Sequence, residues 1–207
     1  MKKELTTDFQ TRLWEAVKLI EQASQAEVIV VLRASSHRYP DIPLVWGISA
    51  AWVSHTYMMY SPDFFENWLV YYLPIFAFAL SYTFAQLPAI TRLCSKKSTL
   101  QKNVEIMARA IFQKGGLYHT RAKTGVLIYC SFLEQSVYIL PDRGIEMAIP
   151  HEEWQRLRLE FNLIFASKKP MDALLIELHK TQLLFGRYLP ALAGDINELP
   201  DVLEIDL

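Results

Sequence analysis

The sequence predicts an α/β domain, a small mixed sheet sandwiched by helices, that is interrupted by an inserted hairpin of two transmembrane helices. Three observations predict this class. The 207 residues are 52% hydrophobic with a mean hydropathy of +0.12, which is high for an ordinary soluble domain. The apolar residues gather in two neighbouring blocks. On both sides of these blocks, short β-branched runs alternate with amphipathic helical patterns, which is typical of an α/β domain.

The first helix and strand are predicted by capping and by periodicity. Residues 7–10 (Thr-Asp-Phe-Gln) form a capping box. Phe9, Leu13, Val17 and Ile20 then recur at helical spacing, and this helix should end near residues 23–25. The β-branched run 27–32 predicts a strand buried on both faces. Residues 33–43 contain two prolines and are expected to form a loop.

The two apolar blocks predict membrane-spanning helices. No Lys or Arg occurs between Arg38 and Arg92, a run of 53 residues. Within it, Leu44–Tyr60 has 17 residues and Trp68–Leu87 has 20, against the roughly 20 needed to cross a bilayer. Aromatic residues near the block ends resemble the belts at membrane interfaces. A hairpin buried in a soluble core is the disfavoured alternative, because the remaining chain has too little surface to cover two helices that are apolar all round.

Charge predicts the topology of this hairpin. The flanks carry six cations, whereas the central turn has two acids and no base. The positive-inside rule therefore places both ends in the cytoplasm and the turn outside. We expect a multi-pass protein of the cell inner membrane, with its globular domain on the cytoplasmic side. The N-terminus has no apolar h-region, so no cleavable signal peptide is expected. His55 is expected to bond within the hairpin or to lie near the interface.

After the apolar blocks, the sequence again predicts the helices and strands of a globular domain. A helix capped by Ser98 or Thr99 should end at Gly115-Gly116. Strands at 125–131 and 137–140 should form a β-hairpin, and the first strand, which cannot stand alone, should join it. Helices should begin near Glu152 and at Pro170. The two cysteines, Cys94 and Cys130, are expected to be reduced thiols. The tail 193–207, with five acids and no base, is expected to be a solvated cap.

Parts of the chain on both sides of the hairpin, over roughly residues 5–40 and 99–203, resemble the TPM domain family, in its bacterial membrane-associated branch. The resemblance rests on residues 124–129 (TGVLIY) with 134–145 (EQSVYILPDRGI), and more weakly on 26–31 and 197–201. It implies an α/β/α sandwich with a small central sheet. It also implies two functional possibilities, an acid phosphatase with metal binding and a non-enzymatic role in maintaining membrane complexes. Better-known members carry the domain outside the cytosol behind a signal peptide, which is not expected here.

The resemblance also implies a domain organisation. Residues 1–43 hold the first helix and strand of a TPM-like domain, 44–90 the transmembrane hairpin, and 91–207 the remainder of the domain. The hairpin is thus an insertion into one domain rather than a boundary between two.

The candidate site residues lie at strand ends. Asp142 ends the predicted β-hairpin, where ligand groups are common in α/β sheets, and is a candidate ligand for a hard cation such as Ca²⁺ or Mg²⁺. Glu27 begins the first strand and is a second candidate metal ligand, the alternative being a solvated residue at the strand end. Arg143 is a candidate to bind a phosphate or carboxylate. The alternative is a structural turn in which Asp142 and Arg143 form a salt bridge. The tail acids and a basic cluster at His119, Arg121 and Lys123 are weaker candidates.

Two function hypotheses follow. The favoured one is a non-enzymatic binding or assembly and maintenance module for a membrane complex, whose partners are the lipid bilayer and another membrane protein bound through the hairpin. The alternative is a metal-dependent phosphatase with Asp142 in its site. No motif for nucleophilic catalysis, a P-loop or a zinc protease occurs, so enzyme status stays open. The net charge of -1 gives no indication of nucleic acid as a partner.

Overall fold

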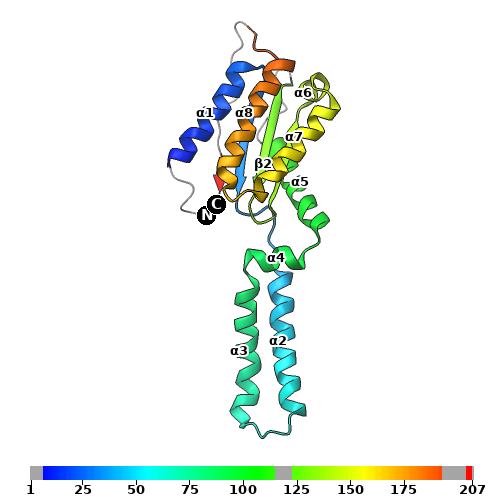
Figure 1. The fold of residues 1–207 in the computed structure, drawn as a ribbon. Coiled ribbons are helices and arrows are strands. Elements are labelled where there is room, and N and C mark those ends of the chain that lie inside the picture. The colour runs from blue at the N-terminus through cyan, green and yellow to red at the C-terminus, as the bar shows by residue number, and fades with distance from the viewer. Residues whose placement is uncertain (1–6, 115–122, 193–203, 207) are drawn as a thin grey trace. The chain divides into compact units, whose positions relative to one another are not determined.

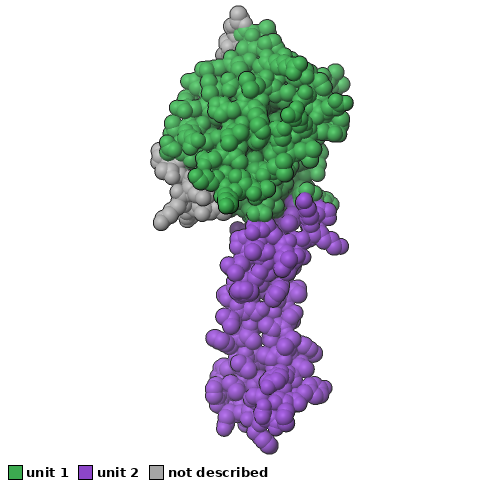
Figure 2. Space-filling model, in the orientation of Figure 1, with its two compact units in different colours: residues 1–36, 101–207 green, residues 37–100 purple. Residues whose placement is uncertain are grey.

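The computed structural model describes residues 7–114, 123–192 and 204–206 (Figure 1). The chain divides into two compact units, which Figure 2 colours separately. Unit 1 combines residues 1–36 with 101–207, and unit 2 is the intervening stretch 37–100. Each unit is described by itself.

Unit 1 is built on a mixed four-stranded sheet with the strand order β3-β2-β1-β4. The central pair β1 and β2 is parallel, with Glu27 opposite Gly125. On the other side of β1 the short strand β4 runs parallel along residues 31–33, while β3 pairs antiparallel with β2. The strands are β1 (Glu27–Arg33), β2 (Gly125–Ser131), β3 (Ser136–Pro141) and β4 (Glu204–Asp206).

Helices cover both faces of this sheet. Figure 1 shows α1 and α8 side by side in unit 1, and they pack with α7 on one face of the sheet. Helix α5 covers the other face. The helices are α1 (Thr7–Ala23), α5 (Lys97–Lys114), α6 (Arg143–Ala148), α7 (His151–Leu163), the 3-10 turn η2 (Ile164–Ala166) and α8 (Pro170–Tyr188).

The alternation of side chains along the strands explains the two cores. Val28, Val30 and Leu32 point into the larger core, which α1, α7 and α8 close. Ile29 and Val31 point into the smaller core beneath α5. Because both faces are buried, β1 is a continuous apolar run rather than an alternating one.

Unit 2 is a helical hairpin followed by one short helix. It comprises α2 (Asp41–Tyr60), α3 (Asn67–Ala85) and α4 (Pro88–Cys94). The two long helices approach closely at Gly47, where an added Cβ would lie 2.7 Å from Cε2 of Phe78. The hydroxyl of Ser81 donates to the Trp46 carbonyl at 3.2 Å. Small residues at the contact allow this close packing, as they do between membrane helices.

The predicted α/β class is confirmed, and so are the first helix, the joining of the first strand to the later β-hairpin in one sheet, and the two final helices. Four elements were not predicted, namely the helices α4 and α6, the 3-10 turn η2 and the strand β4. The tail at 204–206 is therefore paired with β1 rather than a solvated cap, which corrects that expectation for these three residues. Residues 193–203 lie outside the described part of the chain.

The helical hairpin is present, but its two helices differ in apolar character. Among the described residues, α3 is the one helix that is long and apolar enough by length and composition to cross a membrane, and 6% of that stretch is buried. Helix α2 has 20 residues but falls short on composition. Four polar residues explain the difference: Ser49, Ser54, His55 and Thr56.

Candidate functional site

The hairpin of unit 2 exposes large apolar side chains around both helices. Trp52 is 73% exposed on α2, and Tyr71 is 74% exposed on α3. Phe64, in the turn between them, is fully exposed. A soluble protein rarely exposes contiguous apolar surface of this extent, and such surface marks an interaction site for protein or membrane.

The polar side chains of the hairpin fall into two groups. Ser54 donates to the Ala51 carbonyl at 2.9 Å, and Thr83 donates to carbonyls of its own helix. Ser49, His55 and Thr56 make no side-chain hydrogen bond to any described residue. Of the two expectations for His55, a bond within the hairpin is not met among the described residues, and a place near the membrane interface stays a prediction.

Asp142, the leading metal candidate, caps a helix. Its Oδ1 accepts a hydrogen bond from the Arg143 N–H at 2.7 Å and so begins α6. Its own N–H donates to the Gly125 carbonyl at 2.7 Å, which fixes the turn against β2. The Oδ2 atom is buried and has no hydrogen-bond partner among the described residues. Asp is a favoured N-cap because its carboxylate satisfies an unpaired helical N–H.

Arg143 forms no salt bridge with Asp142 or with any other described residue. Its side chain is exposed at the start of α6. The structural turn that was the alternative to a ligand site is present. In place of the expected ion pair, however, the Asp142 carboxylate accepts a hydrogen bond from the Arg143 backbone N–H. The guanidinium is therefore available to an anionic ligand.

The sheet register brings Glu27 near Asp142. Both flank Gly125, Glu27 by strand pairing and Asp142 by its hydrogen bond. Their backbones are thus two strand spacings apart, roughly 10 Å. Gly125 lies between them without a side chain, so the two carboxylates share one edge of the sheet.

Two carboxylates alone do not fit a Ca²⁺ or Mg²⁺ site. Ca²⁺ takes 6–8 oxygen ligands, and Mg²⁺ requires a near-ideal octahedron. The described residues contain no group of three His, Cys, Asp or Glu side chains that could hold a metal ion. His119, Arg121 and most of the tail acids lie outside the described residues. The Oδ2 atom of Asp142, buried and without a hydrogen-bond partner among the described residues, is a feature of this edge that suits a cation.

A buried polar cluster, which sequence reasoning missed, lies at the opposite edge of the sheet. Glu134 is 6% exposed, and its carboxylate accepts hydrogen bonds from the Ser36 N–H at 3.0 and 3.2 Å. The Ser131 hydroxyl also donates to this carboxylate. The Ser36 hydroxyl lies 3.0 Å from the phenol oxygen of Tyr129, whose pKa is raised by burial. These groups satisfy one another, so the cluster fastens the chain where it leaves β1.

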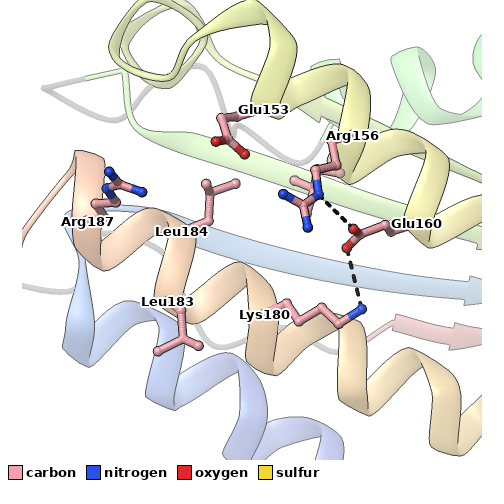
Figure 3. A pocket seen from close by; sticks show the side chains of 8 residues that line it. Glu153, Arg156, Glu160, Lys180, Leu183, Leu184 and Arg187 are labelled. Carbon is pink, nitrogen blue, oxygen red and sulfur yellow. Dashed lines mark hydrogen bonds and ion pairs between the residues drawn. The ribbon is translucent and has the colours of Figure 1, made fainter.

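A groove of about 320 Å³ separates α7 from α8. Figure 3 shows its charged rim, in which Glu160 bridges Arg156 at 3.0 Å and Lys180 at 3.5 Å. Glu153 and Arg187 also line it, and neither forms an ion pair with a described residue. Three leucines complete the lining: Leu157, Leu183 and Leu184. An apolar floor with charges of both signs suits a peptide segment better than a small substrate.

The ion pairs of Glu160 with Arg156 and Lys180 favour its ionised form. Burial opposes ionisation, but the hydrogen bond from Arg156 and the charge of Lys180 outweigh it. The pKa of Glu160 is therefore below its ordinary value. A carboxylate held ionised in this way is a structural ion-pair partner rather than a general acid.

Comparisons with known proteins bear on the fold. No family model and no curated protein matches the chain. Among solved structures it is similar to the BA42 protein of the psychrophilic bacterium Bizionia argentinensis, solved by NMR, at 17% identity and a TM-score of 0.61. The match covers 97% of this chain and 94% of that chain. At this identity the likeness shows the fold alone.

Proposed function

We propose that this chain is a membrane-anchored protein whose α2–α3 hairpin lies in the bilayer and whose α/β unit serves as a non-enzymatic binding or assembly module for a membrane complex. One observation carries the proposal. Both long helices of unit 2 expose large apolar side chains over the length of a bilayer core, with α3 6% buried over its most apolar stretch. In lipid those side chains are solvated by acyl chains, whereas in water they would drive aggregation.

The charge distribution supports a cytoplasmic placement of the two flanks. The 53 residues without Lys or Arg contain the whole hairpin, and the turn carries Asp63 and Glu66. Under the positive-inside rule the turn faces away from the cytoplasm, which places the globular unit at the cytoplasmic side of the inner membrane.

The α/β unit contributes the recognition surface in this proposal. Its groove between α7 and α8 combines leucines with Glu153 and Arg187, neither of which forms an ion pair with a described residue. The arrangement is that of a docking surface for a protein segment, since no nucleophile and base pair lines it. The sequence resemblance to the TPM family agrees with a role in maintaining a membrane complex.

Membrane extraction tests the anchoring. Washing isolated membranes with alkaline carbonate removes peripheral proteins and leaves integral ones in the pellet. We expect the full chain to stay in the pellet and Phe76→Arg/Leu80→Arg to be released or degraded, because a charge near the bilayer centre costs roughly 3 kcal/mol. Phe76→Leu/Leu80→Phe is the matched control and should remain. Release of the unaltered chain would contradict the proposal.

A metal-dependent phosphatase is the second candidate, favoured by one observation, the buried and unpartnered Oδ2 of Asp142. Thermal unfolding in detergent, with and without Ca²⁺ or Mg²⁺, tests it. A ligand that binds the folded state raises the melting temperature. A rise in the unaltered chain that disappears in Asp142→Asn would favour this candidate, and the absence of a rise would remove it.

A further inference from the structure

Helix α4 lies at the end of unit 2 where the chain enters and leaves the helical hairpin (Figure 1). The sulfur of Cys94, the last residue of α4, accepts a hydrogen bond from the Trp46 indole N–H at 3.4 Å. This bond ties α4 to the second turn of α2. Tryptophan favours the boundary between acyl chains and headgroups, so in an anchored hairpin α4 lies at the level of that boundary.

The exposed surface of α4 is apolar. Leu93 is 84% exposed, and Leu87, which precedes the helix, is 48% exposed. Thr91, by contrast, is 5% exposed. A helix surrounded by water buries its leucines and exposes its threonine. The reversed arrangement suits a short helix that lies in the membrane interface with its leucines towards the acyl chains.

Basic side chains adjoin α4 in a part of the sequence that has no acid. No Asp or Glu occurs between Glu66 and Glu105. Within that stretch, Arg92 lies in α4, and Lys96 and Lys97 follow it directly. Both lysines are exposed, and neither forms an ion pair with a described residue. Their charges are therefore not neutralised within the described part of the chain.

The other flank of the hairpin adds to this charge. Arg38 is exposed three residues before α2 and forms no ion pair with a described residue. In unit 2, all of whose residues are described, Asp41 is the one acid at this end, since Asp63 and Glu66 lie at the opposite turn. Four cations against one acid leave this end positive. These cations, called the juxtamembrane cations, are Arg38, Arg92, Lys96 and Lys97.

We propose that the juxtamembrane cations bind the phosphate groups of anionic phospholipids, with Leu93 among the acyl chains of the same lipids. This inference rests on the proposed membrane anchoring and names the class of lipid that the anchored chain prefers. An anionic leaflet attracts basic residues next to a membrane span, by a factor on the order of five in affinity for each cation. Lys96 and Lys97 give up no ion pair with a described residue when they contact a phosphate.

A lipid is favoured over a soluble anionic partner by the position of the cations. They adjoin α3, which is long and apolar enough to cross a membrane. The exposed Leu93 lies next to Arg92 and three residues before Lys96. A phospholipid offers apolar chains directly beneath an anionic headgroup, which matches this arrangement. A free phosphate or a nucleic acid would meet the charges and leave Leu93 in water.

Energy transfer to labelled lipids tests the preference. The full chain is reconstituted in phosphatidylcholine vesicles with a small fraction of either phosphatidylglycerol or phosphatidylcholine labelled on its acyl chain, and its five tryptophans are the donors. We expect more transfer to labelled phosphatidylglycerol than to labelled phosphatidylcholine. The excess should fall as salt is added, because salt screens exposed charges. Equal transfer to the two lipids would overturn the proposal.

Two variants assign the preference to the cations. Lys96→Gln/Lys97→Gln should raise the phosphatidylglycerol fraction needed for half-maximal excess transfer, on the order of fivefold for each lysine lost. Lys96→Arg/Lys97→Arg keeps both charges and should keep the preference. Lys168→Gln/Lys169→Gln changes another adjacent pair of exposed lysines, in unit 1, and is the matched control. A preference that survives Lys96→Gln/Lys97→Gln, or that falls equally in the control, would overturn the assignment.

Two further arms identify what fails if the result is negative. Glycerol 3-phosphate, added at the same total phosphate, should not displace the labelled lipid, and displacement would overturn the lipid in favour of a soluble phosphate ligand. Flotation of the same vesicles reports anchoring. A chain that floats with phosphatidylcholine vesicles but shows no lipid preference refutes this inference alone, whereas a chain that does not float refutes the anchoring as well.

Discussion

The backbone N–H of Ser36 donates to both carboxylate oxygens of Glu134, at 3.0 and 3.2 Å, although the two residues are 98 positions apart in the chain. Ser36 is the last residue of unit 1 before the hairpin begins. Two neighbouring backbone bonds, from Phe132 to Arg33 at 3.0 Å and from Leu133 to Ala34 at 2.8 Å, continue the attachment. The segment that leads into the hairpin is thus held firmly to the β2–β3 turn.

Glu134→Ala should therefore destabilise unit 1 by about 3 kcal/mol, because it leaves the buried Ser36 N–H and Ser131 hydroxyl without an acceptor. Glu134→Gln keeps one acceptor oxygen and should lose about 1 kcal/mol. Chemical denaturation of the detergent-solubilised protein, followed by circular dichroism, measures both. Glu15→Ala, at an exposed position of α1, is the control and should change little. Equal stability of Glu134→Ala and the control would contradict the attachment.

The cap at Asp142 predicts a contrast between two substitutions. Asn is as good an N-cap as Asp, so Asp142→Asn should fold with nearly unchanged stability when no metal is present. Asp142→Ala removes the acceptor for the Arg143 N–H and should lose about 1 kcal/mol. Thermal unfolding distinguishes them. If Asp142→Asn were the more damaging change, the carboxylate charge rather than the cap would be what unit 1 needs.

The ion-pair bridge between α7 and α8 predicts a pH-dependent contribution. Because the pKa of Glu160 is lowered in the folded protein, its ionised form stabilises the fold above the ordinary glutamate pKa of about 4.3. That contribution disappears as the pH falls through the lowered value. Glu160→Gln should thus be less stable than the unaltered protein at neutral pH, and the difference should vanish in acid. A difference that grows as the pH falls would show the opposite sign of shift.

The contact of Gly47 with Phe78 predicts the behaviour of the hairpin. Gly47→Leu should force Phe78 aside and destabilise the helix pair by about 1–3 kcal/mol. Adding Phe78→Ala should restore part of the loss, since the new side chain then has room. Unfolding in increasing dodecyl sulfate measures both. Ile48→Leu, at an exposed neighbour, is the control and should leave the curve in place. An unaffected Gly47→Leu would mean that α2 and α3 do not pack at this point.

Much of the sheet was predictable from local sequence. The β-branched runs in β1 and β2 and the turn at 133–136 determine their elements through side-chain preference, which acts over a few residues. The short elements were not predictable in this way. β4 has three residues and becomes a strand by pairing with residues 31–33 of β1. α6 has six residues, one of them Gly144, so its helical pattern is too brief to recognise.

The residues of the candidate site likewise fall into those that local sequence could identify and those that depend on tertiary packing. Asp142 could be singled out because it follows a strand, and the register places Glu27 at the same edge of the sheet. The hydrogen bond from the Ser36 N–H to the Glu134 carboxylate depends on how the strands pair, and no local sequence pattern predicts it. The groove likewise arises from the packing of α7 on α8, which joins residues from two helices.

The central claim, that the hairpin lies in the bilayer, is tested most directly by the surroundings of Ile75, near the middle of α3 and 65% exposed. A nitroxide label at Ile75→Cys, in the Cys94→Ser chain reconstituted in vesicles, collides with oxygen in lipid and with a water-soluble nickel chelate in water. We predict frequent collisions with oxygen and few with nickel, and the reverse for a label at the exposed turn residue Asp63→Cys. Frequent nickel collisions at Ile75 would place α3 in water and contradict the account.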